Sequence, residues 1–248
     1  MDKGFKFGLI GNDISYSFSK KYFTDKFQKL GLNSYKYKNY DLPEIEEFPF
    51  ITYQREDDFK GFNVTIPYKQ SIIKYLDEVE GDALKIGAVN TIKVTEDNKL
   101  VGYNTDVYGF KMALEPLLEK QHKKALILGT GGASKAIAYA LDILKIEYKF
   151  VSRNSLENNL IYSNLNQQII EAYPLIINCS PLGTYPNIEE SPNIPYEFIT
   201  DKHLLFDLIY NPSETKFLKE GKKRGAIIKN GLEMLELQAE KSWNIWNS

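Results

Sequence analysis

The feature that most constrains this chain is a glycine turn between a predicted strand and a predicted helix, within the stretch KALILGTGGASKAIAYAL. Its spacing matches the G-x-G-x-x-small pattern of dinucleotide-binding folds, in which the backbone approaches a pyrophosphate and the helix amino end offers N–H groups to it. A glycine turn also occurs as a plain tight connection, but here the strand, the spacing, the helix and the following strand agree. A cofactor turn is therefore predicted at Gly129, Gly131, Gly132, Ala133 and Ser134.

The strand after this turn, YKFVSR, ends where the choice between NAD and NADP is usually made. An acidic residue at that position binds the ribose hydroxyls of NAD, whereas this strand ends in Ser152 and Arg153. A guanidinium there is suited to a bidentate contact with a 2′-phosphate. NADP(H) is the predicted cofactor, and the alternative is that Arg153 is only a solvated surface charge.

Short apolar runs bounded by Gly, Pro or Asn alternate with helical patterns along the chain, which is typical of an α/β fold with mostly parallel strands. We place the first domain at residues 1–105 and the second, with the repeated strand–helix rhythm of a Rossmann fold, at 106–229. The pattern GFKMALEPLLEK predicts one helix joining the hairpin to the glycine-turn strand. Further elements are predicted as strands at 5–11, 35–42, 61–67, 148–153, 174–180, 203–210 and 225–229, a hairpin of 87–94 with 100–106, and helices at 19–30, 134–144, 213–224 and 232–246.

The composition excludes several classes of function. Among 248 residues, 31 Lys and Arg oppose 33 Asp and Glu, so no strong field attracts nucleic acid or anionic lipid. The single cysteine, Cys179, excludes an intramolecular disulfide and a cysteine-built zinc site, and it fits a reducing cytoplasm. Lys6 and Gly8 interrupt the first apolar stretch, and no later stretch reaches 18 apolar residues, so neither export nor membrane insertion is expected.

Two charged residues in the first half follow strand ends, where open α/β sheets place their ligands. Lys69 follows GFNVTIP and Asp106 follows LVGYNT, so the two could hold one another while one meets a substrate oxygen. Accidental pairs are common in a chain with this many charges, and on spacing alone both could be solvated. His122 and His203 suggest no ligand cluster, so no metal is expected, and Cys179 is interpreted as an inert thiol.

Six ordered motifs together resemble the shikimate dehydrogenase family along nearly the whole chain: GNDISYSFSK, NVTIPYK, GAVNT with NTD, GTGGAS, NCSPLG and GLEMLELQA. The resemblance implies an α/β substrate domain, a Rossmann-type NADP-binding domain, a C-terminal helix (230–248) that returns to the first domain, and an active site between the domains. It makes Lys69 and Asp106 the catalytic pair. It also implies substrate contacts at Ser17, Ser19, Asn63, Thr65, Asn90, Thr105, Tyr210 and Gln238, and a cofactor contact at Gly231.

Some of these residues also have ordinary structural explanations. Ser17 could be only a helix cap, Asn90 only a hairpin residue and Gln238 only a polar residue on an exposed helix face. The chain also departs from the family's usual pattern at Asp13, Lys20, Val107 and Glu157. Glu157 matters most, because a carboxylate there does not help Arg153 to hold a 2′-phosphate.

The activity that the resemblance implies is that of an NADP-dependent oxidoreductase acting on a CH–OH group, reducing 3-dehydroshikimate to shikimate for aromatic amino acid and chorismate biosynthesis. Its partners would be this small substrate and NADP(H), with no nucleic acid or membrane, and the chain would be a monomer or a homodimer. The alternatives are a quinate/shikimate dehydrogenase using NAD(P), a folate-linked dehydrogenase of related fold, and a dinucleotide-sensing module without catalysis.

Overall fold

A computed structural model describes residues 4–15, 17–53, 58–154 and 159–248, and it divides into two compact units. The first unit contains residues 1–105 together with 239–248, and the second contains residues 106–238. The first boundary falls between Thr105 and Asp106. The chain leaves the second unit within the C-terminal helix, after Gln238 rather than at residue 230.

In the first unit, the described residues form a six-stranded sheet in the order β2-β1-β3-β5-β6-β4. Strands β1, β2 and β3 are parallel, whereas β5 runs antiparallel to both of its neighbours, so this sheet is mixed. Because the chain passes from β1 to β2 on one side and then to β3 on the other, the strand order reverses between β1 and β3. The strands are β1 (Lys6–Gly11), β2 (Lys36–Asp41), β3 (Phe59–Val64), β4 (Glu78–Val79), β5 (Thr91–Val94) and β6 (Leu100–Tyr103).

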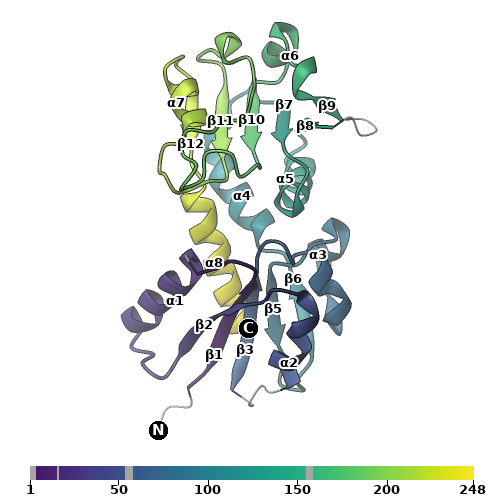
Figure 1. Ribbon diagram of the computed structural model, residues 1–248, viewed down its shortest axis with the longest axis vertical. Helices are drawn as coiled ribbons and strands as arrows, with labels where there is room; N and C mark the ends of the chain where they lie inside the picture. The colour runs from purple at the N-terminus through teal and green to yellow at the C-terminus, as the bar shows by residue number, and fades with distance from the viewer. Residues whose placement is uncertain (1–3, 16, 54–57, 155–158) are drawn as a thin grey trace. The chain divides into compact units, whose positions relative to one another are not determined.

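One face of this sheet packs against α1 (Phe18–Lys29) and against the end of α8 (Leu232–Trp246) (Figure 1). Phe23 and Phe27 from α1 and Trp246 from α8 share an aromatic core with the strands. A Cβ at Gly61 would overlap the Trp246 indole, so glycine is required there for the helix to approach β3. A second core on residues of β3, β5 and β6 includes Phe48 of α2 (Phe48–Tyr53) and Ala83 of α3 (Gly81–Ile86).

The second unit contains a parallel six-stranded sheet among its described residues, in the order β12-β11-β10-β7-β8-β9. Numbered from β7, this is the 3-2-1-4-5-6 order of the Rossmann fold, whose order reverses between β7 and β10. The strands are β7 (Lys124–Leu128), β8 (Glu147–Ser152), β9 (Leu160–Ile161), β10 (Leu175–Asn178), β11 (Leu204–Asp207) and β12 (Ile227–Lys229), and the helices are α4 (Asp106–Leu114), α5 (Gly132–Ile143), α6 (Gln167–Ala172), α7 (Lys216–Lys222) and the first turns of α8.

The sequence predicts a single long helix after Asp106, and this prediction is wrong in the length of the helix. Helix α4 ends at Leu114, and Pro116 lies in a separate 3-10 turn at 115–117. Proline has no N–H to donate and its ring crowds the preceding turn, so the apolar pattern continues although the α-helix does not. No helix in the described part of the chain is long and apolar enough to cross a membrane.

Candidate active site

In each unit the order of the parallel strands reverses between two neighbouring strands, and ligands of open α/β sheets bind beyond the strand ends at such places. In the first unit this place adjoins the loops after β1 and β3, and in the second unit the loops after β7 and β10. The loop after β1 carries Ser17, the loop after β3 carries Thr65 and Lys69, and the loop after β7 carries the glycine turn.

The first unit contains a buried polar network centred on the side-chain amide of Asn63 on β3. The Tyr37 hydroxyl donates to Asn63 Oδ1 at 2.8 Å, and Asn63 Nδ2 donates to Ser242 Oγ at 3.0 Å and to Thr91 Oγ1 at 3.3 Å. Asn63 Nδ2 also donates to the Asn90 backbone carbonyl at 3.3 Å, and because a carbonyl only accepts, this contact fixes the orientation of the Asn63 amide.

The same network extends to Asn90 and Thr105, two further predicted substrate residues. Asn90 Oδ1 accepts the Thr105 backbone N–H at 2.7 Å, and Asn90 Nδ2 donates to Thr105 Oγ1 at 3.0 Å. The Thr91 hydroxyl lies 3.2 Å from Thr105 Oγ1 and 2.7 Å from Ser242 Oγ, so it joins the two amide residues. Amide and hydroxyl groups without net charge suit the recognition of a neutral polyol ring.

At its other end the network reaches Ser19 through Tyr37. Burial raises the pKa of the Tyr37 hydroxyl well above its ordinary value, and a hydrogen bond with Ser19 acts in the opposite direction. Tyr37 is therefore a neutral donor to Asn63 at physiological pH. The structure thus brings Ser19, Asn63, Asn90 and Thr105 into one connected set.

Tyr37, Thr91 and Ser242 are the members of this set that the sequence did not single out. Tyr37 occupies the inward side of an alternating strand, and Ser242 lies on the apolar helix face between Ala239 and Trp246. A polar residue at such a position is a signal that could have identified them, because buried hydroxyls require hydrogen-bond partners.

Ser17, Thr65 and Lys69 flank this set in the loops. Ser17 is the N-cap of α1, and its hydroxyl accepts the Ser19 N–H at 3.2 Å, so the helix-cap explanation is satisfied in the structure. Thr65 follows β3 directly, and its N–H donates to the Ile10 carbonyl at 2.9 Å. Lys69 is half-buried, and its carbonyl accepts the Val89 N–H at 2.7 Å.

The glycine turn of the second unit leads from β7 into α5 and has open space beside its backbone. Gly129 has φ 110°, a conformation that favours glycine, and among the described residues none but its chain neighbours comes within 4 Å of where a Cβ of Gly131 would stand. Gly131 is the N-cap of α5, while Gly132 and Ala133 form its first turn without an acidic residue. The Ser134 hydroxyl donates back to the Gly131 carbonyl at 2.6 Å. Open space before a helix amino end that carries no acid fits a pyrophosphate.

Ser152 and Arg153, at the end of β8, differ in their exposure to solvent. Ser152 is buried, and its hydroxyl donates to the Asn154 carbonyl at 2.5 Å, so it shapes the turn after the strand. Arg153 is exposed and available to solvent. Glu157, the departure that bears on 2′-phosphate binding, lies outside the described residues.

The remaining predicted residues belong to the second unit. Asp106 is the buried first residue of α4, and Gln238 is buried in α8 with its side chain donating to the Leu235 carbonyl at 3.0 Å. Tyr210 is half-buried, which raises its pKa. Gly231 lies against the backbone of Leu208, where a Cβ would overlap the carbonyl, so packing alone already requires glycine there. The roles of all four in binding stay predictions.

Burial raises the pKa of the Cys179 thiol, so the thiol is protonated at physiological pH. His122 and His203 are both buried, and each accepts a backbone N–H at Nδ1, from Glu119 and Thr200 respectively. Both rings therefore have structural partners.

The chain is similar to known proteins over nearly its whole length. The sequence profile described as the shikimate dehydrogenase substrate binding domain matches residues 9–92. A shikimate dehydrogenase (NADP(+)) of Methanococcus maripaludis is 42% identical over 257 residues, covering 96% of this chain and 90% of that protein. A shikimate dehydrogenase solved in complex with NADP+ has a TM-score of 0.86 at 36% identity, covering 98% of this chain and 90% of that one. The shikimate 5-dehydrogenase of Thermus thermophilus, solved with NADP(H) and shikimate, has a TM-score of 0.86 at 30% identity, covering 98% and 93%. This chain therefore belongs to the shikimate dehydrogenase family.

Proposed function

We propose that this protein is a shikimate dehydrogenase that reduces 3-dehydroshikimate to shikimate with NADPH. The observation that carries this proposal is the neutral network of Asn63, Asn90 and Thr105 in a chain whose other unit has a Rossmann sheet and a glycine turn. Relatives that cover almost the whole chain carry the same name. The first unit would bind the substrate and the second unit the cofactor. A cytoplasmic location stays a prediction from the single cysteine.

The proposed cofactor preference rests on the end of β8. Arg153 is exposed beyond the strand, and neither it nor Ser152 is an acid that would repel a 2′-phosphate. The pyrophosphate would be held by the turn from Gly129 to Ala133 and by the amino end of α5. Ser134 supports that turn by its hydrogen bond to Gly131.

When bound, NADPH supplies hydride to the ketone carbon of 3-dehydroshikimate. Negative charge then grows on the ketone oxygen, and Lys69 is proposed to neutralise it and to donate the proton that this oxygen takes up. Asp106 is proposed to orient the lysine ammonium and to accept a hydrogen bond from a ring hydroxyl. Ser17 and Ser19 would bind the carboxylate, and the amide residues would bind the hydroxyls.

Steady-state assays of NADP+ reduction test the proposal directly. We expect shikimate to be oxidised efficiently with NADP+ and quinate to be a poor substrate. Comparable efficiency with quinate would make the protein a quinate/shikimate dehydrogenase. Binding of NADP+ without turnover of either polyol would instead favour a dinucleotide-sensing module.

Substitution of Lys69 tests the catalytic assignment. Lys69→Ala should lower kcat by about 10²- to 10⁴-fold, the range of a positioned proton-transfer group, with a smaller effect on the KM for shikimate. Lys74→Ala is the matched control, because Lys74 lies in the same segment but pairs with Glu46 on the surface. Near-wild-type turnover in folded Lys69→Ala would remove this lysine from the mechanism.

A further inference from the structure

Asp207, at the end of β11, is a buried carboxylate that the proposed mechanism does not use. It has no exposed surface, and all its hydrogen-bond partners in the described part of the chain are uncharged. Asp207 Oδ1 accepts from Asn178 Nδ2 at 3.0 Å and from the Ile209 N–H at 3.1 Å, while Oδ2 accepts the Thr215 hydroxyl at 2.6 Å. A buried charge is costly unless it is hydrogen-bonded, and these three donors hold the Asp207 carboxylate in place.

The first partner connects Asp207 to the loop after β10. Asn178 Nδ2 donates to Asp207, and Asn178 Oδ1 accepts both the Ser180 N–H at 3.0 Å and the Ser180 hydroxyl at 2.6 Å. That loop is also adjacent to the glycine turn, because the Cys179 carbonyl and the Ser180 nitrogen lie 3.4 Å from where a Cβ of Gly129 would stand. Asp207 is thus linked by consecutive contacts to the segment that faces the proposed pyrophosphate site.

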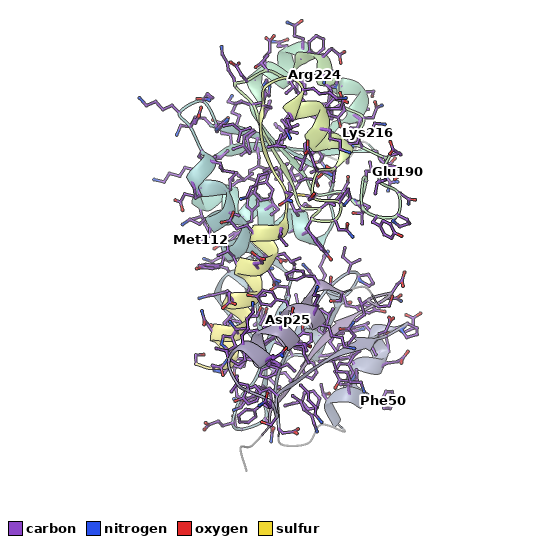
Figure 2. The ribbon with its side chains drawn as sticks, turned by 90° about the vertical axis from the view of Figure 1, so that its left-hand side faces the viewer. Asp25, Phe50, Met112, Glu190, Lys216 and Arg224 are labelled. Atoms are coloured by element: carbon purple, nitrogen blue, oxygen red, sulfur yellow. The ribbon has the colours of Figure 1, made fainter. Side chains whose placement is uncertain are left out.

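The other partners connect Asp207 to the segments after β11. Thr215 is the N-cap of α7, and the Ile209 N–H lies at the start of the loop that leads to it. The loop after β10 returns to the same place, since Gly183 packs on the Thr215 side chain and the Tyr185 N–H donates to the Asn211 carbonyl at 3.2 Å. Farther along the same loop, Lys216 of α7 donates to the Glu189 carbonyl at 3.0 Å, beside Glu190 (Figure 2).

We propose that Asp207 is a positioning residue for cofactor binding: its carboxylate holds Asn178, and through it Ser180, so that the loop after β10 keeps its place against the glycine turn. The proposal rests on the proposed function, in which the second unit binds NADP(H). Asp207 acts on this loop through Asn178, which donates to its carboxylate.

The ionised form of Asp207 is the one that fits these contacts, because three donors point at its two oxygens and a carboxylate only accepts. Burial raises its pKa to about 6, and the hydrogen bonds from Thr215, Ile209 and Asn178 oppose the rise. The titratable neighbours whose electrostatic interaction with Asp207 is resolved are Cys179 and Tyr196, and burial raises the pKa of each, so both stay neutral at physiological pH. Protonation below pH 6 would weaken the charge-assisted bonds and disturb the loop.

Asp207→Asn tests this inference, because asparagine keeps the shape and removes the charge. At pH 7.5 we expect the KM for NADPH to rise about tenfold while the KM for 3-dehydroshikimate stays near wild type. Between pH 7.5 and 5.5 the wild-type KM for NADPH should rise more steeply than that of the variant. The 2′-phosphate also titrates near pH 6, but it does so with both proteins, so the difference between the curves isolates Asp207.

Asp201→Asn is the matched control, since Asp201 carries the same charge in the same unit and is exposed. Where Asp207→Asn does not fold, Thr215→Val removes one donor to the carboxylate and should raise the KM for NADPH, while Thr215→Ser should restore it. Amide hydrogen exchange over residues 178–184 should be faster in Asp207→Asn and in Thr215→Val.

Three results would overturn the inference: a wild-type KM for NADPH in folded Asp207→Asn, an equal rise in KM for both reactants, or parallel pH curves. These results differ from a failure of the proposed function. In that case the wild-type protein itself would show no binding of NADPH.

Discussion

Ser17 combines two roles that substitution can separate. Its hydroxyl caps α1 by accepting the Ser19 N–H, and the family resemblance gives the same hydroxyl a contact with the substrate carboxylate. Aspartate is as good an N-cap as serine, and its charge also favours the helix amino end. The same charge would repel a bound carboxylate.

We therefore expect Ser17→Asp to keep the thermal stability of the wild type and to raise the KM for shikimate about tenfold. Ser17→Ala should lower stability by roughly 0.5 to 2 kcal/mol and weaken shikimate binding by roughly 1 to 3 kcal/mol. Calorimetry and steady-state kinetics measure the two effects separately. An unchanged KM in Ser17→Asp would leave Ser17 as a helix cap only.

We expect Arg153 to set the cofactor preference of the proposed enzyme. One charge-assisted contact of roughly 1.5 to 3 kcal/mol corresponds to a preference for NADPH over NADH of roughly 10- to 150-fold in kcat/KM. Arg153→Ala should lose most of this preference through a higher KM for NADPH and leave NADH nearly unaffected. Lys149→Ala, which removes an exposed positive charge from the same strand, should not change it. Equal losses with both cofactors in Arg153→Ala would show that this arginine is a surface charge.

Thr91, at the start of β5, connects polar side chains of β3 and α8 through its hydroxyl. Its hydroxyl lies within hydrogen-bond distance of Asn63, Thr105 and Ser242. Thr91→Val keeps the shape and leaves these buried groups short of a partner, which costs roughly 1 to 3 kcal/mol. We expect the KM for shikimate to rise and the KM for NADP+ to stay unchanged, with Thr91→Ser close to wild type. A change in both KM values would indicate general loss of structure.

Local patterns in the sequence predict a helix or strand well where the element is long enough to show a regular repeat of apolar residues. Helix α5 was expected at 134–144 and occupies Gly132–Ile143, and the hairpin expected from GAVNTIKV and LVGYNTD is the antiparallel pair β5 and β6. The two-residue strands β4 and β9 have no period to detect, and helices α2, α3 and α6 are six residues each. Their formation depends on tertiary packing, because isolated helices of that length are not stable in water.

The candidate site was predicted less completely, for a related reason. Motifs identify residues that lie close together in the sequence, and they led to Asn63, Asn90 and Thr105. Tyr37 and Ser242 come from distant segments, and only the pairing of β1 with β2 and the packing of α8 bring them to Asn63. Such partners become apparent when the hydrogen bonds of each buried polar group are counted.

At the scale of the whole molecule, we expect pH to act on the stability of the second unit, because His122 and Asp207, two buried groups with shifted pKa values, both belong to it. His122 Nδ1 accepts the Glu119 N–H at 2.9 Å, so the neutral ring fits and a second ring proton would face a donor. Burial lowers the pKa of His122 below its ordinary value of 6.5, while the Lys202 carbonyl opposes the change. A group whose folded pKa is lowered in this way binds its proton more readily in the unfolded chain.

Stability from His122 is therefore present above pH 6.5 and is lost as the pH falls through that value toward the folded pKa. Asp207 has the opposite sign. Its pKa is raised from 3.8 to about 6, so its buried charge costs stability above pH 6, and that cost is relieved as the pH falls from about 6 toward 3.8. As the pH falls, protonation of His122 first lowers the stability of the folded protein below pH 6.5. Protonation of Asp207 then raises it below pH 6.

His122→Gln should separate these contributions, because glutamine can donate to the Lys202 carbonyl but takes up no proton. We expect a lower melting temperature than wild type at pH 7.5, since the acceptor for Glu119 is lost, and a flatter dependence on pH between 7 and 6. The melting temperature of Asp207→Asn should instead fall more steeply than that of the wild type below pH 6, because the stabilisation from protonating Asp207 is absent. Scanning calorimetry at closely spaced pH values can follow the transition of the second unit even where the two units do not unfold together. Curves for His122→Gln and wild type that run parallel from pH 7 to 6 would mean that His122 titrates alike in the folded and unfolded chain.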